Sequence, residues 1–365
     1  MWLNPDQPTG AGYHGLRFVY GTSSLGYNTI HKWVGLGYDA MVLVTGATGF
    51  VGRTVIRYLA ASGYPVRCLV RNNMSGLRLP RDLTVFVTAG SLSDTEVIRN
   101  ALLGVETVIH LASADWQGLE TGLIDVDHAG SRELLKVAVE ANVRRIVYLS
   151  HLGADRASAF SVHKIKGIVE EFIRRSGIPH TIIRSALLYG EEDSFTNAAA
   201  ALLRVVPVVC PLPGSGQVLL QPLWVGDLAT CIVRSLADDS LVNRTISVGG
   251  PEFLSLASVA HLIMQQIGVR RIIMGTPHPY LRWMVQRLRP LLSNSPLTTH
   301  WLDHVAVNRT CEVNSMPRYF DIKPAVFEHT IGYLTKGKWR SDLDLLLGRS
   351  SMELVKSRES LKPKS

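Results

Sequence analysis

The segment Thr45-Gly-Ala-Thr-Gly-Phe-Val-Gly52 decides the fold of this chain. It follows the apolar run Met41–Val44, which has the length and β-branching of a buried parallel strand. Gly46, Gly49 and Gly52 permit a tight turn, a close approach of the backbone to a ligand and close packing of the next helix. That helix directs its free N–H groups and the positive end of its dipole at the loop. We therefore expect the diphosphate of a dinucleotide there.

The surroundings of these glycines argue against the alternative interpretation, an ordinary tight turn. An amphipathic stretch follows the loop and a second apolar run begins at Pro65, which is the context that a dinucleotide-binding motif requires. Strands and helices then alternate, which predicts a doubly wound parallel α/β sheet of the Rossmann type. The predicted strands are 41–45, 65–70, 84–88, 106–111, 144–149 and 179–183. The clearest helices between them are 94–103, 127–141 and 162–175.

The pattern divides the chain into four segments. Strands and helices alternate over residues 41–190, which form the predicted NAD(P)-binding domain. The pattern changes at 191–335, which form a predicted smaller C-terminal α/β lobe for a substrate or partner, interlocked with the first. Residues 1–40 show neither the apolar periodicity of a helix nor that of a strand, and Met41 begins the first strand. We therefore interpret this leader as disordered or as a start-site artefact. Residues 336–365 are predicted to be a basic tail. Within the second lobe we predict helices at 226–237 and 255–267 and a short strand at 245–248.

The composition is that of a soluble globular protein, with 46% hydrophobic and 19% charged residues. No run reaches the ~20 apolar residues of a membrane span. No basic stretch followed by an apolar core opens the chain, which argues against a secretory signal. The four cysteines lie far apart and include no CxxC pair, which favours a reduced, cytoplasmic protein.

Positive charge is concentrated in the last third of the chain. From Arg270 onward sixteen Lys or Arg residues face eight Asp or Glu, an excess equal to the net charge of +8 of the whole chain. This part is predicted either to meet an anionic membrane surface or an acidic protein, or to be solvated, as we favour for Val355–Ser365. Aromatic residues are not interleaved with the basic ones, which argues against nucleic acid as a partner.

Several motifs beyond the glycine loop point to one family. They are Val108-Ile-His-Leu-Ala112, Val147-Tyr-Leu-Ser150, Glu170–Arg184, Gln221-Pro-Leu-Trp-Val-Gly-Asp227 and Val248-Gly-Gly-Pro251. Together with the loop, the chain from about 41 to 335 resembles atypical short-chain dehydrogenases/reductases, namely NmrA-like proteins and relatives of the NAD(P)-binding accessory subunit of respiratory complex I. The resemblance implies a bound dinucleotide. The residues implied to bind it are Gly46, Thr48, Gly49, Phe50, Val51 and Gly52 at the diphosphate, Ala112 and Ser113 at its middle, and Lys164 at the nicotinamide ribose.

The end of the second strand indicates which coenzyme is bound. NAD-preferring members of this fold place an acidic residue there to bind the ribose 2′-hydroxyl. Here that place holds Arg71, followed by Asn72 and Asn73. A guanidinium can pair with a 2′-phosphate, so NADP(H) is favoured over NAD(H). A surface arginine is the alternative interpretation. Ser91 stands where relatives often carry an adenine-contacting Asp.

Catalysis is where the sequence departs from the family that it resembles. The usual site places a Tyr four residues before a Lys, so that the Tyr passes a proton as hydride moves. Four residues before Lys164 stands Phe160, and if Lys166 sets the register the matching residue is Val162. Neither side chain can donate a proton. The Ser and Asn positions of the site hold Ser150 and Asp127.

Two interpretations of function follow. In the first, the protein binds the cofactor without turnover and acts as a regulator, an assembly factor or a subunit of a membrane-associated protein complex. In the second, it resembles Tyr-less, isoflavone-reductase-like NADPH-dependent oxidoreductases, in which Lys164 handles the proton, with His163 or Ser150, and a quinone or enone is reduced. The missing proton donor favours the first, while the lysines and Ser150 fit either. We expect a cytoplasmic protein, peripheral to a membrane if it binds one, with no transmembrane segment.

Other candidate sites are weaker. His300 and His304 have a metal-ligand spacing, but no third ligand is evident and the apolar residues between them indicate a packed helix, so we predict no metal. His110 is predicted either to line the nicotinamide pocket or to be a core histidine. Trp283 with Leu288, Leu291 and Leu292 is predicted to pack in the core, with an apolar face for a partner or lipid as the alternative. Asp227 before a helix is interpreted as an N-cap.

Overall fold

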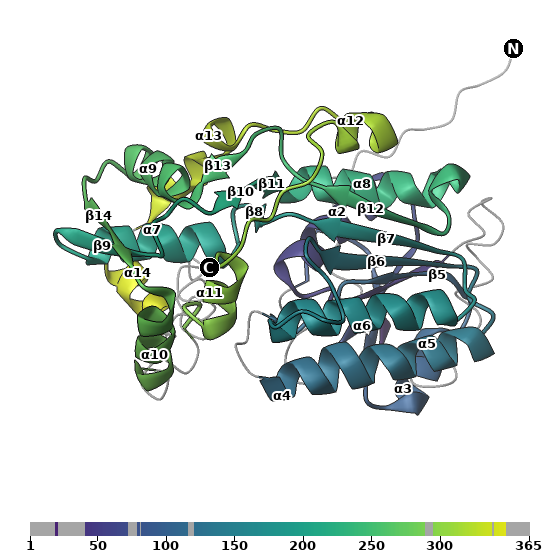
Figure 1. Cartoon of the computed structure of the whole chain (residues 1–365). Helices are drawn as coiled ribbons and strands as arrows, with labels where there is room; N and C mark the ends of the chain where they lie inside the picture. Colours follow the sequence, from purple (N-terminus) through teal and green to yellow (C-terminus); the bar gives the residue numbers. More distant parts are fainter. Residues whose placement is uncertain are drawn as a thin grey trace, which may run out of the picture.

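A parallel β-sheet lies at the centre of the first half of the chain (Figure 1). The computed structural model describes residues 19–20, 41–71, 79–80, 82–115, 120–288, 295–337 and 339–347. Every pair of neighbouring strands in this sheet is parallel, in the order β1-β4-β3-β2-β5-β6-β7-β12. The strands are β1 (Val19–Tyr20), β2 (Met41–Thr45), β3 (Val66–Val70), β4 (Phe86–Ala89), β5 (Val105–His110), β6 (Arg145–His151), β7 (His180–Ser185) and β12 (Arg244–Val248).

Helices cover both faces of this sheet, and alternate residues of each strand face them. Val42 and Val44 of β2 join the core under α2 and α8, whereas Leu43 points into the core on the opposite face. Figure 1 shows α8 on one side of the sheet and α3, α5 and α6 on the other. The doubly wound α/β fold predicted from the sequence is therefore confirmed. The helices are α2 (Phe50–Ala61), α3 (Thr95–Ala101), α4 (Glu120–Gly122), the π-helical η3 (Leu123–Gly130), α5 (Ser131–Glu140), α6 (Ser161–Arg175) and α8 (Val225–Ala237).

The order of the strands reverses at β2. From β2 the chain runs outward through β3 to β4, and it then returns to the other side of β2 to form β5, β6 and β7. The loops that follow β2 and β5 leave the sheet in opposite directions, and ligands of open α/β sheets bind in the crevice that this opens at the carboxyl ends of the strands. The glycine loop after β2 and the segment Leu111–Asp115 after β5 lie at this edge.

A second lobe lies beside that edge and has its own core (Figure 1). Buried residues such as Phe195, Leu256 and Phe327 form this core. The helices of the lobe are α7 (Phe195–Val205), α9 (Leu256–Ile267), α10 (His278–Leu288), α11 (Thr299–His304), α13 (Phe327–Thr330), the 3-10 helix η6 (Ile331–Lys336) and α14 (Trp339–Leu346). Its strand pairs are β9 (Val209–Pro213) with β14 (Ile272–Thr276) and β10 (Leu219–Leu220) with β13 (Leu254–Ser255). Connecting elements are β8 (Leu188–Tyr189), β11 (Leu223–Trp224), the 3-10 helix η4 (Asp239–Leu241) and α12 (Ser315–Phe320).

Three predicted boundaries differ from the structure. The strand near 245–248, predicted for the second lobe, is β12, which pairs in parallel with β7 at the edge of the main sheet. Helix α8 likewise packs on the main sheet, where the guanidinium of Arg145 on β6 donates to the carbonyl of Ser235 at 2.7 Å. Helix α14 lies beyond the boundary predicted at 335, and its Asp342 accepts a hydrogen bond from Arg204 of α7 at 3.0 Å.

The ends of the chain lie largely outside the described residues. Of the predicted leader, 1–40, the structure describes only β1, which pairs with β4. Of the predicted basic tail, it describes residues 336–337 and 339–347. Within the described part of the chain, none of the helices combines the length and the apolar character needed to cross a bilayer.

Candidate functional site

The glycine loop packs directly on the end of β5. Gly46 has φ +72°, and a Cβ there would lie 2.7 Å from backbone atoms of Leu111 and Ala112, so only glycine fits without a shift of the chain. A Cβ on Gly52 would lie 2.2 Å from the carbonyl oxygen of Gly46, which explains how α2 approaches the loop so closely. Gly49 differs from both, because it is exposed and a Cβ there would meet only the Gly46 oxygen, at 3.2 Å.

The first turn of α2 is electrostatically open to an anion. Gly49 is the N-cap residue, it provides no side-chain cap, and no acidic residue stands in the first turn. The first N–H groups of a helix have no partner within it, so those at Phe50 and Val51 face the loop. Arg53 donates from Nη1 to the carbonyl of Thr48 at 2.5 Å and also pairs with Glu192. The predicted diphosphate residues thus form one continuous, uncapped turn that fits a dinucleotide.

Asp127 organises the segment that follows β5. Its Oδ1 accepts from the hydroxyl of Ser113 at 2.7 Å, and its Oδ2 accepts from the N–H of Ala114 at 2.8 Å. The ammonium of Lys166 lies 3.1 Å from Oδ1, and both charged side chains are almost completely buried. Asp127 belongs to the π-helical turn η3, a distortion that is frequent at functional sites.

The two lysines of α6 have different environments in the structure. Lys164 lies on the exposed side of α6, whereas Lys166, 2% exposed, points inward to Asp127. Two residues in a helix are about 200° apart, so only one of the two lysines can face the sheet. The position four residues before Lys166 is Val162, which is 1% exposed. The apolar spacing of Val162, Val169 and Ile173 on α6 is a sequence signal that places Lys166 on the buried face.

The surroundings of Lys166 and Tyr148 set the protonation states of both side chains. Burial works to lower the pKa of Lys166, but the carboxylates of Asp127 and Asp115 raise it, with a net rise above its ordinary value. Burial raises the pKa of the Tyr148 phenol, whose ring lies 5.4 Å from the Lys166 ammonium. At neutral pH the pair therefore consists of a protonated lysine and an un-ionised tyrosine.

Ser150 and His163, the other predicted catalytic residues, have separate partners. The hydroxyl of Ser150 donates to Oε1 of Glu170 at 2.7 Å, and the same carboxylate pairs with Arg184 at 2.6 Å. His163 lies against Arg309, whose Nη2 is 3.1 Å from both of its ring nitrogens. The structure does not unite Lys164, Ser150 and His163 in one hydrogen-bonded group among the described contacts.

A buried polar cluster that the sequence analysis did not find joins the two lobes. Asp115 accepts a hydrogen bond from Nε2 of His151 at 2.9 Å through its side chain and from Nδ1 of His300 at 2.9 Å through its carbonyl. Arg309 donates to the carbonyl of Leu152 at 3.3 Å and also to Nδ1 of His304. Residues of β6 and α6 are thereby tied to α11 and to the segment that follows it. No spacing in the sequence indicates this cluster, because its members come from four separate segments.

Two histidines of this cluster, His163 and His304, are neutral. Burial first, and then the charge of Arg309, lowers the pKa of His163 to about 3 and lowers that of His304 well below its ordinary value. Burial lowers the pKa of the Arg309 guanidinium to about 10, so it keeps its charge. Burial works to raise the pKa of Asp115, but the hydrogen bond from His151 and the charge of Lys166 lower it more, and the carboxylate balances Arg309.

The remaining predicted residues are placed as follows. Arg71, at the end of β3, and Ser91 are both exposed, while Asn72 and Asn73 lie outside the described residues. His110 is a satisfied core histidine, because its ring nitrogens lie 2.7 Å from the hydroxyl of Thr45 and 2.8 Å from that of Ser131.

The residues weighed as metal ligands, as an N-cap and as part of an apolar face have the following environments in the structure. His300 and His304 bind separate partners, and no group of three or more potential ligands is arranged for a metal in the parts of the chain that the structure describes. Asp227 accepts from the N–H of Ala325 at 2.7 Å rather than from its own helix. Trp283 is exposed rather than packed in the core, whereas Leu291 and Leu292 lie outside the described residues.

Known proteins resemble this chain in sequence. The model of the NmrA-like family matches residues 38–270. The mouse protein NADH dehydrogenase [ubiquinone] 1 alpha subcomplex subunit 9, mitochondrial, is 32% identical over 214 residues, which are 57% of this chain and 56% of that protein. The photosystem II assembly factor Ycf39 of Cyanophora paradoxa is 31% identical over 240 residues, covering 66% of this chain and 73% of that protein. The chain thus spans little more than half the length of the mouse relative.

Solved structures show the same fold at lower sequence identity. The UDP-glucose 4-epimerase of Thermus thermophilus, solved in complex with NAD, has a TM-score of 0.61 and 19% identity, and covers 81% of this chain and 97% of its own. The Bordetella bronchiseptica enzyme WbmG, also solved with NAD, has a TM-score of 0.61 and 18% identity over 86% of this chain and 97% of its own. At this identity the likeness concerns the fold alone.

Proposed function

Because the chain belongs to the NmrA-like family, we propose that it binds NAD(P)(H) at the crevice between β2 and β5 and keeps it without turnover. The coenzyme then stabilises a protein with a regulatory, assembly or subunit role. The observation that carries this proposal is the position four residues before Lys166. The buried side chain of Val162 occupies it, where the family's usual mechanism needs a proton donor.

The geometry of the crevice supports one arrangement of the coenzyme. The diphosphate lies on the uncapped first turn of α2, and the adenosine ribose lies near Arg71 at the end of β3. Asp127 holds the segment after β5 beside the middle of the coenzyme, and Lys166, in place of Lys164, faces the nicotinamide ribose. The residues assigned to binding are Gly46, Thr48, Gly49, Phe50, Val51, Gly52, Arg71, Ala112, Ser113 and Lys166.

The preference for NADP(H) over NAD(H) rests on Arg71. Its side chain is exposed at the end of the second strand of the motif, where a guanidinium can pair with a 2′-phosphate. The comparison structures that contain NAD are those of other proteins and do not bear on this choice.

The proposed absence of turnover rests on the lack of a group that can exchange a proton beside the nicotinamide. A bound nicotinamide supplies hydride transfer, which needs a group that gains or loses a proton beside it. Asp127 and its neighbours hold Lys166 protonated, and burial keeps Tyr148 un-ionised. Neither group is poised to exchange a proton at neutral pH.

The alternative function is a Tyr-less NADPH-dependent oxidoreductase that reduces a quinone or enone. The observation that favours it is the ammonium of Lys166 itself, which is fixed beside Ser113 and Asp127 at the same edge of the sheet. In that function Lys166, rather than Lys164, handles the proton.

The proposed partners are the dinucleotide and a membrane-associated protein complex. The names of two relatives, a subunit of an NADH dehydrogenase and an assembly factor of photosystem II, support the second. The excess of positive charge after Arg270 supports an anionic surface as the place of contact. The proposed location is the cytoplasmic compartment, peripheral to a membrane.

Substitution of Gly49 tests the coenzyme site. Asp is a good N-cap residue, so Gly49→Asp is expected to keep α2 intact while its carboxylate repels the diphosphate. At about 5 Å and an effective dielectric of about 20 this repulsion is roughly 3 kcal/mol, or at least ~100-fold in Kd. Gly49→Asn, which caps without charge, is the matched control. Titration is followed by NADPH and NADH fluorescence.

The outcomes separate the parts of the proposal. Failure of the folded wild-type protein to bind either coenzyme, oxidised or reduced, contradicts the site as a whole. Equal affinity for NADPH and NADH, unchanged in Arg71→Glu, contradicts the preference for NADP(H). Steady oxidation of NADPH by a soluble quinone or enone, lost in Lys166→Met, supports the oxidoreductase in place of the proposal.

A further inference from the structure

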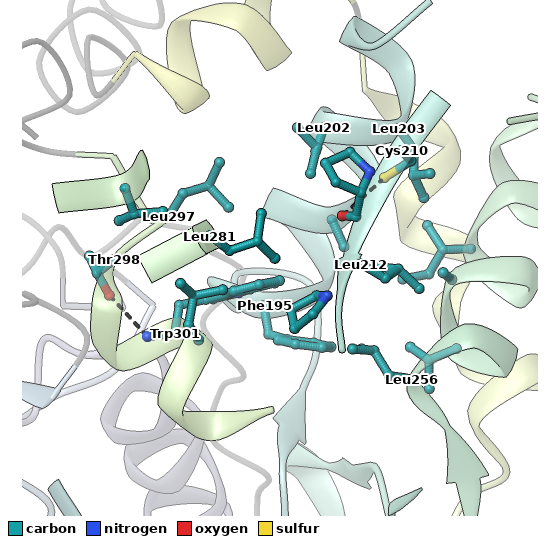
Figure 2. A pocket seen from close by; sticks show the side chains of 18 of the residues that line it. Phe195, Leu202, Leu203, Cys210, Leu212, Leu256, Leu281, Leu297, Thr298 and Trp301 are labelled. Carbon is teal, nitrogen blue, oxygen red and sulfur yellow. Dashed lines mark hydrogen bonds between the residues drawn. The ribbon is translucent and has the colours of Figure 1, made fainter. Parts of the chain in front are cut away.

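An apolar cavity of about 120 Å³ lies inside the second lobe (Figure 2). Helices α7, α9, α10 and α11 and strand β9 provide its walls. Figure 2 shows the side chains of Phe195, Leu212, Leu256, Leu281 and Trp301 converging on it. It uses none of the residues that we assign to the coenzyme.

The walls offer a guest almost no polar group. The hydroxyl of Thr298 already accepts from the backbone N–H of Trp301 at 3.1 Å, and the thiol of Cys210 is directed to the carbonyl of Pro211. Nε1 of Trp301 is buried and has no hydrogen-bond partner in the described part of the chain. A buried water needs two to four polar partners, which this cavity does not supply. Its chemistry therefore selects a hydrocarbon.

The volume limits what fits. An engineered apolar cavity of about 150 Å³ binds benzene, so a cavity of this size accepts one ring or a short length of chain. A whole lipid is too large, whereas the end of an acyl or isoprenoid chain matches both the volume and the apolar lining.

Helix α10 connects this cavity with the outside of the molecule. Leu281, Met284 and Val285 on its inner side line the cavity. On its outer side Tyr280 and Trp283 are 56% and 54% exposed, with their rings stacked at 6.0 Å. Figure 1 shows α10 at the outer end of the second lobe.

The outer side of α10 has the chemistry of an interfacial helix. The guanidinium of Arg287 lies 5.8 Å from the ring centroid of Trp283, and Arg287 is exposed. Exposed aromatic rings beside a basic side chain are characteristic of helices that lie in the headgroup region of an anionic bilayer. This surface complements an anionic membrane in both charge and polarity.

We propose that the cavity binds the end of a hydrocarbon chain of a membrane lipid, acyl or isoprenoid, and that α10 rests on the bilayer that supplies it. The inference goes beyond the proposed coenzyme function and does not depend on it. Loss of coenzyme binding would leave it intact, since the two sites share no residue.

Filling the cavity tests the binding site. Decan-1-ol, a straight chain, and geraniol, a branched isoprenoid alcohol, are the probes, and hexane-1,6-diol is the polar control. We expect one or both probes to raise the thermal midpoint of the wild-type protein by several degrees, and the diol to leave it unchanged. Ala260→Leu, which adds a side chain from α9 into the cavity, is expected to abolish the shift. Gln265→Leu, on the exposed side of the same helix, should retain it.

The outcomes decide the proposal in each case. A shift by decan-1-ol alone assigns an acyl chain, and a shift by geraniol alone assigns an isoprenoid chain. No shift of the wild type by either probe, or an equal shift in Ala260→Leu, overturns the site. Should Ala260→Leu fail to fold, Ala199→Leu from α7 on the other wall replaces it with the same expectations.

Vesicle binding tests the source of the chain. The full-length protein is expected to sediment with vesicles containing phosphatidylglycerol at least tenfold more than with pure phosphatidylcholine vesicles. The double variant Tyr280→Gln/Trp283→Gln should lose most of this binding and keep the decan-1-ol shift. Unchanged vesicle binding in that variant, or none in the wild type, overturns the assignment of α10 to the membrane.

Discussion

Two lysines of α6, two residues apart, provide the sharpest test of the site. Lys166→Met and Lys164→Met are the same substitution in the same helix, but only Lys166 is buried and paired. We expect Lys166→Met to destabilise the protein strongly and Lys164→Met to change its stability by no more than about 0.5 kcal/mol, as is usual for exposed positions.

The magnitude for Lys166 follows from its ion pair with Asp127. At 3.1 Å and an effective dielectric of about 20, the Coulomb attraction is about 5 kcal/mol. Removing the ammonium also removes the penalty for burying it, and Asp127 keeps its hydrogen bonds from Ser113 and Ala114. The usual loss when one member of a buried pair is removed is about 3–5 kcal/mol, and we expect the lower part of that range.

Urea denaturation of the wild type and both variants measures these differences in the free energy of unfolding. A third variant, Lys166→Met/Asp127→Asn, removes the stranded charge and should recover part of the lost stability. The reasoning is refuted if Lys164→Met is destabilised as much as Lys166→Met. It is also refuted if the double variant is as unstable as the sum of its two single variants, because the side chains would then not interact.

Two further predictions concern the polar cluster between the lobes. His163 has a pKa of about 3 in the folded protein and an ordinary value of 6.5. As the pH falls, the unfolded chain therefore takes up a proton at this residue at a higher pH than the folded protein does. The stability that it contributes is complete above pH 6.5 and is lost as the pH falls toward 3, by about 1.4 kcal/mol per pH unit. His163→Gln should flatten the dependence of the urea midpoint on pH between 6.5 and 4, and an unchanged slope would contradict the assignment. Arg309→Met should cost about 2–4 kcal/mol, since the residue is 3% exposed, and should raise the pKa of His163, as measured by NMR titration.

The main sheet could be predicted because each strand carries its own signal. A run such as Val42-Leu43-Val44 is apolar on both faces, as a central parallel strand must be, and turn residues bound it. The sequence predicts the strand at 245–248 but assigns it to the second lobe instead of the main sheet. Its pattern fits any sheet edge, and its pairing with β7 depends on contacts between segments some sixty residues apart, which a local pattern does not contain.

The candidate site could be predicted only where its residues follow one another. The glycine loop is a continuous motif, and its three glycines have distinct steric roles in the structure. Choosing between Lys164 and Lys166 needed the phase of α6, which the family resemblance alone did not provide. Asp115, His151 and Arg309 meet only because β5, β6 and the segment after α11 end at one place. Residue type and order could not reveal that convergence.

Helix α11 lies between the buried polar cluster and the apolar cavity. Its His300 and His304 bind Asp115 and Arg309 on the side of the polar cluster, while Trp301 and Leu302 line the apolar cavity. All four side chains are buried, so a substitution at any of them would disturb both regions through the same short helix. A loss of function there could not be assigned to the polar cluster or to the cavity. The variants that test the two proposals separately must therefore lie away from α11, at Gly49, the N-cap residue of α2, and at Ala260 of α9.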